Sequence, residues 1–289
     1  MSTAGHRVGL IGLGAMGAPM ATHLFHANLL DVVGNRSPSK VAAFVAQHAG
    51  VRSAVTVADF APCEVVILNV SLDEDVLQNV RDLSTVLAPG SIVIDHSTVS
   101  QQTALEAARV LNAKGVHFID APVSGGVEGA RNGKLSIMVG AAAEDLARVH
   151  SILETYGARI THMGDVGSGQ ATKAVNQIMV AGINEAVTEA LALGEALRLD
   201  PEKLIPTLMG GAASNWFLDK RGASMLRSEF LPGFKNAHML KDLRIVQGMA
   251  AALGLELPTL NQAERDYTRL SEGQGDADTS SLITLKRKA

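Results

Sequence analysis

The sequence has a single cysteine, few aromatic residues and no excess of positive charge, and each shortage excludes a class of protein. Cys63 is the only cysteine among 289 residues, so neither an intramolecular disulfide nor a cysteine-based zinc cluster can form. Aromatic residues make up 3%, too few for base-stacking platforms. The 25 Lys and Arg against 29 Asp and Glu give a net charge of -4, so we expect no nucleic-acid partner.

Long hydrophobic runs are also missing. No uninterrupted stretch reaches the ~18 apolar residues that a membrane span needs, and we expect no membrane partner. The apolar run 8–21 superficially resembles a signal peptide, but glycines and a proline interrupt it. We interpret it as folded structure and expect a cytoplasmic protein. Apolar residues at 47% supply ample core for one large domain or two ordinary ones.

Strand and helix patterns alternate in the first half of the chain. We predict strands at 7–11, 31–34, 64–69, 91–95, 116–120 and 135–139, and helices at 15–26, from Ser37-Pro38 onward, at 103–114 and at 143–153. The segments EVVILN and SIVID show no polar alternation, which is typical of strands buried on both faces of a parallel sheet. Residues 1–164 are therefore predicted to form an α/β domain with a doubly wound, Rossmann-type sheet.

The pattern changes near Gly164, where closely spaced glycines indicate a loop. Residues 171–199 contain no proline and predict one helix of roughly 40 Å. This helix is apolar on more than one face, so we expect a homodimer or homotetramer that covers the second face. Residues 165–289 are predicted to form an all-helical substrate and oligomerisation domain. The polar tail at 273–289, which carries Lys286-Arg287-Lys288 near its end, is expected to be solvated.

A glycine-rich motif connects the first predicted strand to the first predicted helix. It reads Gly12-Leu13-Gly14-Ala15-Met16-Gly17, which is G-x-G-x-x-G in the context that a dinucleotide site requires. Gly12 permits a tight turn, Gly14 lets a pyrophosphate approach the backbone, and Gly17 lets the helix pack closely on the strand. The helix N-terminus supplies N–H groups for the phosphates. A plain glycine-rich turn is the alternative interpretation.

The end of the second predicted strand indicates which dinucleotide is preferred. An acidic residue about 20 residues after the glycines would bind a ribose 2′-hydroxyl and favour NAD. The chain instead carries Asn35-Arg36-Ser37 there. No carboxylate repels a 2′-phosphate at this position, and the Arg36 guanidinium can bind one. We therefore expect NADP(H) to be preferred over NAD(H), unless Arg36 is an ordinary surface arginine.

Four motifs, in this order, resemble those of the β-hydroxyacid dehydrogenases. They are GLGAMGAPMA (12–21), DAPVSGG (120–126), GxGxxxKxxN (167–176) and KDL (241–243). That family includes 3-hydroxyisobutyrate dehydrogenase, tartronate semialdehyde reductase and the glyoxylate/succinic semialdehyde reductases. The resemblance covers nearly the whole chain. It implies a Rossmann domain, a long helix leading out of it, an all-helical C-terminal domain, and an active site between the two domains.

The resemblance also implies roles for residues at matching positions. Lys173 resembles the family's catalytic lysine, and Asn176 resembles its partner on the same helix face. The implied substrate site contains Thr98, Ser124, Gly125, Gly126, Phe234 and Asp242. The implied cofactor site contains residues 12–17, Asn35, Arg36, Ser37, Leu68, Asn69, Asp73, Thr98 and Lys241. Phe234 matches the pocket phenylalanine of the glyoxylate reductases, whereas Asn69 stands where many relatives have proline.

These residues suit the reduction of a small aldehyde acid. A lysine is protonated at neutral pH unless strongly desolvated, so Lys173 can donate a proton to the alkoxide that hydride transfer creates. Ser124 and the two glycines after it offer a hydroxyl and backbone amides to a substrate carboxylate. The histidines are scattered without metal-ligand spacing, so we expect no metal, and we assign His96 no role.

Three other functions stay open at this point. The same loop serves an oxidising 3-hydroxyacid dehydrogenase that acts on 3-hydroxyisobutyrate or a similar compound. An imine reductase has a similar fold and glycine loop, but such enzymes typically lack a lysine at the position of Lys173. A non-catalytic NADP-binding module would be expected to lose that lysine as well.

Overall fold

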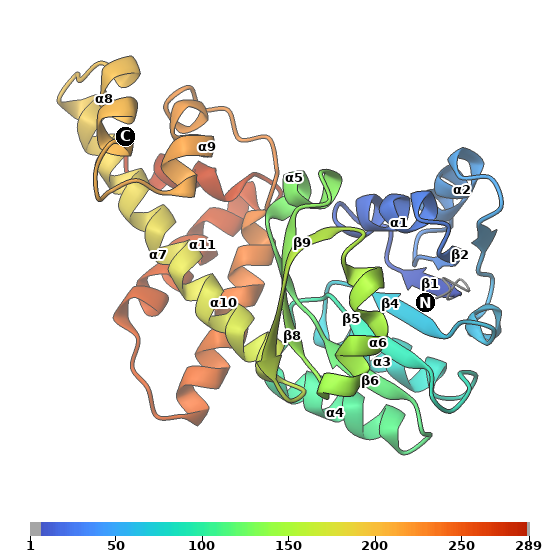
Figure 1. Cartoon of the computed structure of the whole chain (residues 1–289). Coiled ribbons are helices and arrows are strands. Elements are labelled where there is room, and N and C mark those ends of the chain that lie inside the picture. The colour runs from blue at the N-terminus through green and yellow to red at the C-terminus, as the bar shows by residue number, and fades with distance from the viewer. Residues whose placement is uncertain (1–6, 288–289) are drawn as a thin grey trace. The chain divides into compact units, whose positions relative to one another are not determined.

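The computed structural model describes residues 7–287, which divide into two compact units between Lys173 and Ala174. The first unit contains a mixed sheet with helices, and the second is helical (Figure 1). No helix within residues 7–287 is both long and apolar enough to cross a bilayer.

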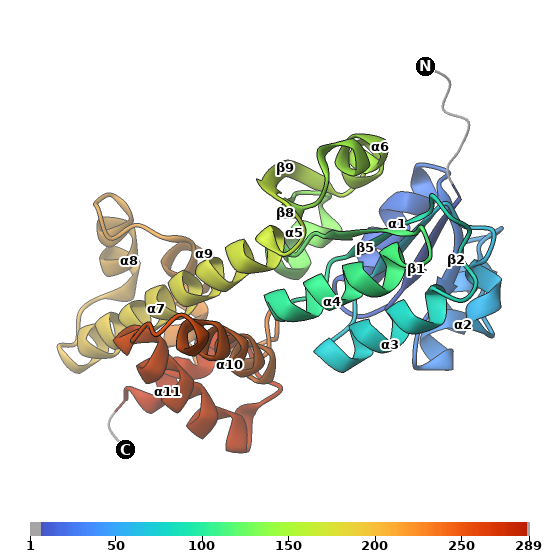
Figure 2. The same cartoon turned by 90° about the horizontal axis from the view of Figure 1, so that it is seen from below.

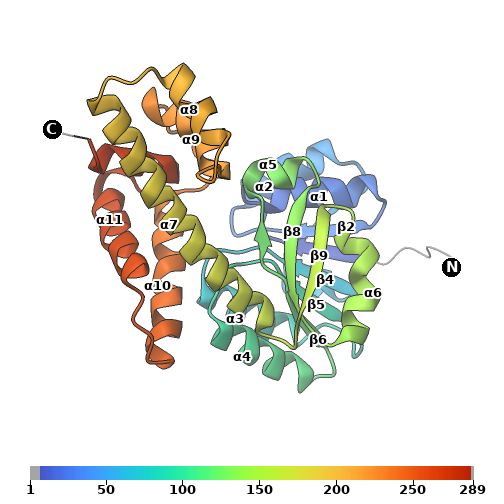
Figure 3. The ribbon, with the colours of Figure 1, turned by 60° about the vertical axis from the view of Figure 1, so that its left-hand side comes forward.

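The first unit is built on one nine-stranded sheet. Its strands are β1 (Val8–Ile11), β2 (Leu30–Gly34), β3 (Arg52–Ser53), β4 (Val65–Leu68), β5 (Ile92–Asp95), β6 (His117–Asp120), β7 (Val123–Ser124), β8 (Leu135–Gly140) and β9 (Gly157–Gly164). Their order is β3-β2-β1-β4-β5-β6-β8-β7, with β9 also paired to β8. Figure 3 shows β8 and β9 side by side. The six strands from β3 to β6 in this order are parallel, and β8 runs antiparallel to β6 and β7. The parallel, Rossmann-type core is confirmed.

Helices cover both faces of this sheet. They are α1 (Gly17–His26), α2 (Pro38–Gln47), α3 (Asp73–Leu83), α4 (Gln101–Asn112), α5 (Gly126–Arg131) and α6 (Ala143–Leu153), with a 3-10 turn at Val57–Phe60. Apolar side chains of α1, α2 and α6 share one buried core with the sheet. Those of α3 and α4, which lie side by side in Figure 2, share a second. Each face of the sheet is thus buried, as continuous apolar strands require.

Several elements were not anticipated from the sequence. β3 and β7 have two residues each, too short to leave a periodic signal. β9 has mostly exposed side chains and no apolar run, yet it pairs with β8 along its length. α3 starts with three acidic residues, and its apolar positions Val76, Val80 and Leu83 have the spacing of one helix face.

The second unit contains only helices and a 3-10 turn across residues 174–287. α7 (Ser168–Ala196) runs from the first unit into the second, and α8 (Pro201–Met209), α9 (Trp216–Leu226), α10 (Asn236–Ala252), α11 (Pro258–Gln274) and the 3-10 turn η2 (Thr279–Leu285) follow. The expected long helix is present as α7. The Asp200 side chain caps α8 by accepting the N–H of Glu202. α10 and α11 pack side by side around one apolar core (Figure 3).

The expectation of a solvated C-terminal tail is wrong for residues 278–283, which are buried, and for Lys286 and Arg287, which form ion pairs. Lys288 lies outside the described residues. The Lys286 ammonium lies 2.6 Å from a Glu185 oxygen and 2.7 Å from an Asp266 oxygen. The Arg287 guanidinium forms two hydrogen bonds with Glu195, at 2.7 and 2.8 Å. These acidic partners are 20 to 101 positions away in the sequence, so the local charge pattern could not reveal them.

Candidate active site

The glycine-rich turn after β1 has the shape that a dinucleotide diphosphate needs. Gly12 has φ +110°, and a Cβ there would collide with the backbone oxygen of Asn69. A Cβ on Gly17 would collide with the backbone oxygen of Gly12, so the turn and α1 can approach closely only with glycine. At Gly14, by contrast, a Cβ would meet no atom within 4 Å. The backbone at Gly14 is therefore open to a ligand beside the N-terminus of α1.

The segment after β2 contacts this turn directly. The Asn35 side-chain oxygen accepts the N–H of Leu13 at 2.9 Å, and its amide donates to the Ser37 carbonyl at 3.3 Å. Asn35 therefore fixes the glycine turn itself. The Arg36 side chain is 87% exposed, and its guanidinium lies 3.9 Å from a carboxylate oxygen of Asp75. Arg36 thus places a guanidinium on a long, exposed side chain at the end of β2, where it is only weakly paired.

The residues that follow β4 serve the fold as well as the expected cofactor side. Leu68 is buried at the end of β4, and the N–H of Asn69 donates back to β1. Asp73 begins α3, and one of its oxygens accepts the N–H of Ser100 at 2.9 Å and the hydroxyl of Thr103 at 2.6 Å. The Asp73 side chain thereby joins α3 to the first turn of α4. A role for Asp73 toward the cofactor stays a prediction.

A buried carboxylate joins β6 to the start of α7. Asp120 accepts the N–H of Gly167 at 2.7 Å and that of Gln170 at 2.8 Å, one on each oxygen. Burial raises the pKa of Asp120 to about 6, while these N–H donors act in the opposite direction. A Cβ on Gly169 would collide with the Asp120 backbone, so α7 can begin here only with glycine at that position. Asp120 and Gly169 together fix where α7 starts.

The side chain of Gln170 continues this network to the end of β5. Its amide nitrogen donates to the Ser97 carbonyl at 2.8 Å, and its oxygen accepts the N–H of Val99 at 3.2 Å. Both partners flank Thr98, so Gln170 determines the backbone around that half-buried residue. Asp120 and Gln170 were not assigned roles from the sequence. Their only signal was their position inside the motifs DAPVSGG and GxGxxxKxxN.

The ammonium of Lys173 is held beside the expected carboxylate-binding loop. Its Nζ donates to the Val123 carbonyl at 2.9 Å, and Val123 directly precedes Ser124. Gly125 and Gly126 have φ +128° and +62°, conformations that favour glycine, and α5 begins at Gly126. The structure therefore brings Lys173 together with residues 123–126 within the first unit.

A second chain of polar side chains lies in the helical unit. Asn176 donates to the Gln177 side-chain oxygen at 2.8 Å, and the Gln177 amide donates to Asp242 at 2.5 Å. The other Asp242 oxygen lies 3.0 Å from the ammonium of Lys241. Asn176, Asp242 and Lys241 are thus brought together, with Gln177 as a connecting residue that the sequence did not single out.

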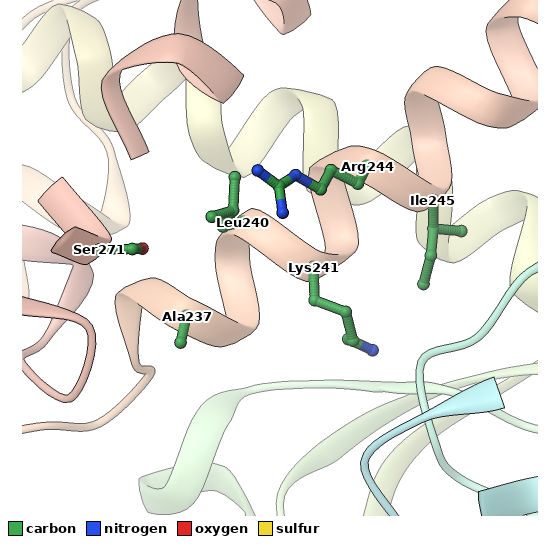
Figure 4. Close-up of a pocket in the computed structure, with 6 residues that line it drawn as sticks. All are labelled: Ala237, Leu240, Lys241, Arg244, Ile245 and Ser271. Carbon is green, nitrogen blue, oxygen red and sulfur yellow. The ribbon is translucent and has the colours of Figure 1, made fainter. Parts of the chain in front are cut away.

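Lys241 borders a shallow pocket of about 430 Å³ on α10, shown in Figure 4. The pocket is lined by Ala237, Leu240, Lys241, Arg244, Ile245 and Ser271. Its two cations are Lys241 and Arg244, and Arg244 also pairs with Glu264 at 3.2 Å. The pocket is suited to an anionic group.

Phe234 lies in the loop before α10 and packs against the core of α10 and α11. Its N–H and that of Gly233 donate to one oxygen of the buried Asp278, at 3.1 and 2.8 Å. Asp278 therefore determines the position of Phe234, and it too was missed from the sequence. Within residues 7–287 no three His, Cys, Asp or Glu side chains are arranged to hold a metal ion.

The fold and these sites define a class of protein. A parallel sheet with an open glycine turn at its first βα junction binds a nicotinamide dinucleotide, and a held ammonium beside backbone amides suits a carbonyl group. This combination is that of an NAD(P)-dependent oxidoreductase. Residues 7–164 match the NAD binding domain of 6-phosphogluconate dehydrogenase, and residues 167–286 match the NAD-binding domain of NADP-dependent 3-hydroxyisobutyrate dehydrogenase. The chain belongs to the β-hydroxyacid dehydrogenase family of 3-hydroxyisobutyrate dehydrogenase-like enzymes.

Individual relatives agree over the whole length. The 2-hydroxy-3-oxopropionate reductase of Escherichia coli is 36% identical over 96% of both chains. An uncharacterized oxidoreductase of Synechocystis is 35% identical over 98% of this chain and 99% of its own. The structure of Mycobacterium tuberculosis 3-hydroxyisobutyrate dehydrogenase with L-serine matches with a TM-score of 0.89 and 31% identity, covering 98% of this chain and 100% of the other. The family match and the names of the characterised relatives together support an oxidoreductase that acts on a CH–OH group.

Proposed function

We propose that the chain catalyses the NADPH-dependent reduction of a small aldehyde acid to the hydroxyacid, with Lys173 as the proton donor. Glyoxylate and succinic semialdehyde are the first substrates to consider, because Arg36 and Phe234 resemble residues of that branch. The observation that carries the proposal is the 2.9 Å hydrogen bond from the Lys173 ammonium to Val123, next to the backbone amides at 124–126. A proton donor and a carboxylate-binding loop are thereby supplied by one unit.

The residues divide the work between binding and proton transfer. The Ser124 hydroxyl and the amides of Gly125 and Gly126 bind the substrate carboxylate, which leaves the aldehyde near the Lys173 ammonium. NADPH, when bound at the glycine turn, would supply the hydride for the carbonyl carbon. Lys173 gives a proton to the carbonyl oxygen as negative charge develops there.

The lysine is tested by comparing two lysine-to-methionine variants. Lys173→Met is expected to lower kcat by about 10²–10⁴-fold, the usual contribution of a positioned proton donor. Lys203→Met is the control, because Lys203 is an exposed lysine of α8 that pairs only with Asp200 at 3.6 Å. Equal turnover by both variants would remove Lys173 from the mechanism.

The preference for NADPH rests on Arg36. A charged hydrogen bond contributes about 1.5–3 kcal/mol, so Arg36→Ala should lower the NADPH/NADH ratio of kcat/KM by about 10–100-fold. Arg52→Ala is the control, because Arg52 lies on β3 and pairs with Asp31 at 2.7 Å. An unchanged ratio in Arg36→Ala would leave the 2′-phosphate without its proposed partner.

The second candidate is NAD(P)-dependent oxidation of a 3-hydroxyacid such as 3-hydroxyisobutyrate. The similarity to the M. tuberculosis enzyme supports it, and the same residues run the reaction backwards when Lys173 accepts the proton. The two functions are distinguished by assaying glyoxylate, succinic semialdehyde and tartronate semialdehyde with NADPH at neutral pH, and 3-hydroxyisobutyrate and serine with NADP⁺ at alkaline pH. Turnover in the second assay alone would select oxidation.

A further inference from the structure

His96 and Tyr156 form a buried pair just beyond the carboxyl ends of the central strands. His96 is the first residue after β5 and is 2% exposed, and Tyr156 directly precedes β9 and is fully buried. The two rings meet edge to face, with centroids 5.5 Å apart. Each is a polar group inside an apolar core, a placement that costs free energy unless every polar atom has a partner.

The hydrogen bonds of the pair fix the protonation of the imidazole. The Nδ1 of His96 lies 2.6 Å from the Ala121 carbonyl, and its Nε2 lies 2.9 Å from the Tyr156 hydroxyl. Because a carbonyl can only accept, Nδ1 carries the hydrogen, and Nε2 then accepts the hydrogen of the Tyr156 hydroxyl. Burial lowers the pKa of His96 to about 4, so the ring is neutral at neutral pH.

The pair connects two segments that the proposed reaction uses. The β5–β6 ladder has its last matched pair at Asp95 and Asp120, so the imidazole joins the next residue of each strand. His96 lies two residues before Thr98, and Ala121 lies three residues before Ser124. The side chain of His96 therefore continues the strand pairing one residue past the end of the sheet. Beyond this point the segment after β5 leads to Thr98, and the segment after β6 leads to Ser124.

We propose that His96 is a positioning residue for the substrate carboxylate, which it serves by fixing the Ala121–Ser124 segment against Thr98, and that Tyr156 holds its ring in the required tautomer. The inference rests on the proposed function of the loop at 124–126. A neutral donor suits this position, since it orders the loop without placing a charge in the buried core. Neither residue touches the substrate.

The kinetic test separates positioning from general stability. His96→Met removes both hydrogen bonds and is expected to raise the KM of the aldehyde acid by about tenfold, as small misplacements at a site do, with the Kd of NADPH unchanged. His96→Asn should keep the KM of the aldehyde acid close to the wild-type value, because its amide can still donate to the Ala121 carbonyl. His48→Met is the matched control, since His48 is also buried with a carbonyl partner at 2.8 Å and a hydroxyl partner at 3.4 Å, both on α1 and α2.

A spectroscopic test needs no substrate at all. Imidazole ¹⁵N spectra distinguish the Nδ1–H from the Nε2–H tautomer, and the His96→Asn variant identifies the His96 signals. The Nδ1–H form is expected in the wild type. The opposite tautomer, or a substrate KM that rises equally in His96→Met and His48→Met, would overturn the inference. Should the enzyme prove to oxidise hydroxyacids instead, the same KM comparison is made with the hydroxyacid, and the tautomer result stands independently.

Discussion

Replacing Lys286 with methionine should destabilise the helical unit strongly. The Lys286 ammonium joins η2 to α7 through Glu185 and to α11 through Asp266, at 2.6 and 2.7 Å. All three side chains are buried, Lys286 being 12% exposed and the two carboxylates less. Methionine fills a similar volume but removes the cation that Glu185 and Asp266 share, while Asp266 keeps the longer ion pair with Arg269, at 3.6 Å.

The expected loss follows from this burial. Removing one partner of a buried ion pair costs about 3–5 kcal/mol, because the remaining charge stays desolvated. With a urea dependence of about 1–3 kcal/mol per molar, the unfolding midpoint should fall by at least about 1 M. Burial already raises the pKa of Glu185, and the Lys286 hydrogen bond opposes this rise. In the variant the rise is unopposed, so protonation at acidic pH should narrow the difference from the wild type.

The assay can report on this unit alone. Trp216 is the only tryptophan and begins α9, so its fluorescence during urea unfolding follows the helical unit. Lys235→Met is the matched control: Lys235 pairs with Asp276 at the same 2.6 Å, but Asp276 is 92% exposed. Such surface pairs contribute about 0–1 kcal/mol. Similar midpoint shifts in the two variants would refute the claim that the buried ion pairs of Lys286 stabilise the helical unit more than an exposed pair does.

Three further outcomes are expected. Gly14→Ala should have the stability of the wild type, because the added Cβ meets no atom within 4 Å. It should nevertheless weaken NADPH binding by at least about tenfold in a fluorescence titration, because the new methyl occupies the space that the diphosphate needs. The buried neutral His96 takes up a proton on unfolding, because its pKa is about 4 in the folded protein. Lowering the pH from about 7 to 5 should therefore reduce the free energy of unfolding of the wild type by about 2 kcal/mol more than that of His96→Met. Urea unfolding of both proteins at both pH values measures this difference. Met179 and Leu193 are exposed on α7, so we propose that a second copy covers them; Met179→Glu/Leu193→Glu should then be monomeric by light scattering, whereas a monomeric wild type would rule this out.

Much of the fold could be predicted because its signals are local. The runs at β4 and β5 are apolar without alternation, and the glycine spacing after β1 reflects collisions within a six-residue turn. β9 could not be predicted, because its partner β8 rather than its own composition makes it a strand. The ion pairs of Lys286 and Arg287 were missed for the same reason, because their acidic partners lie on α7 and α11. Pairings across long sequence separations leave no trace in local periodicity.

The candidate site divides in the same way. Lys173 and Ser124 stand in motifs and could be singled out, whereas the residues that hold them in place could not. Asp120 and Gln170 form hydrogen bonds with the backbone of a neighbouring segment, and His96 forms one of its two with the Ala121 carbonyl. An apolar core would cost less free energy than these buried polar groups, so stability alone does not account for them. These groups instead determine how the elements are placed. Asp120 accepts N–H groups at the N-terminus of α7, where a carboxylate interacts favourably with the helix dipole. The helix placed in this way brings Lys173 to the Val123 carbonyl. The proposed proton donor is therefore positioned by a carboxylate 53 residues away in the sequence, and a change at Asp120 should lower kcat before it weakens cofactor binding.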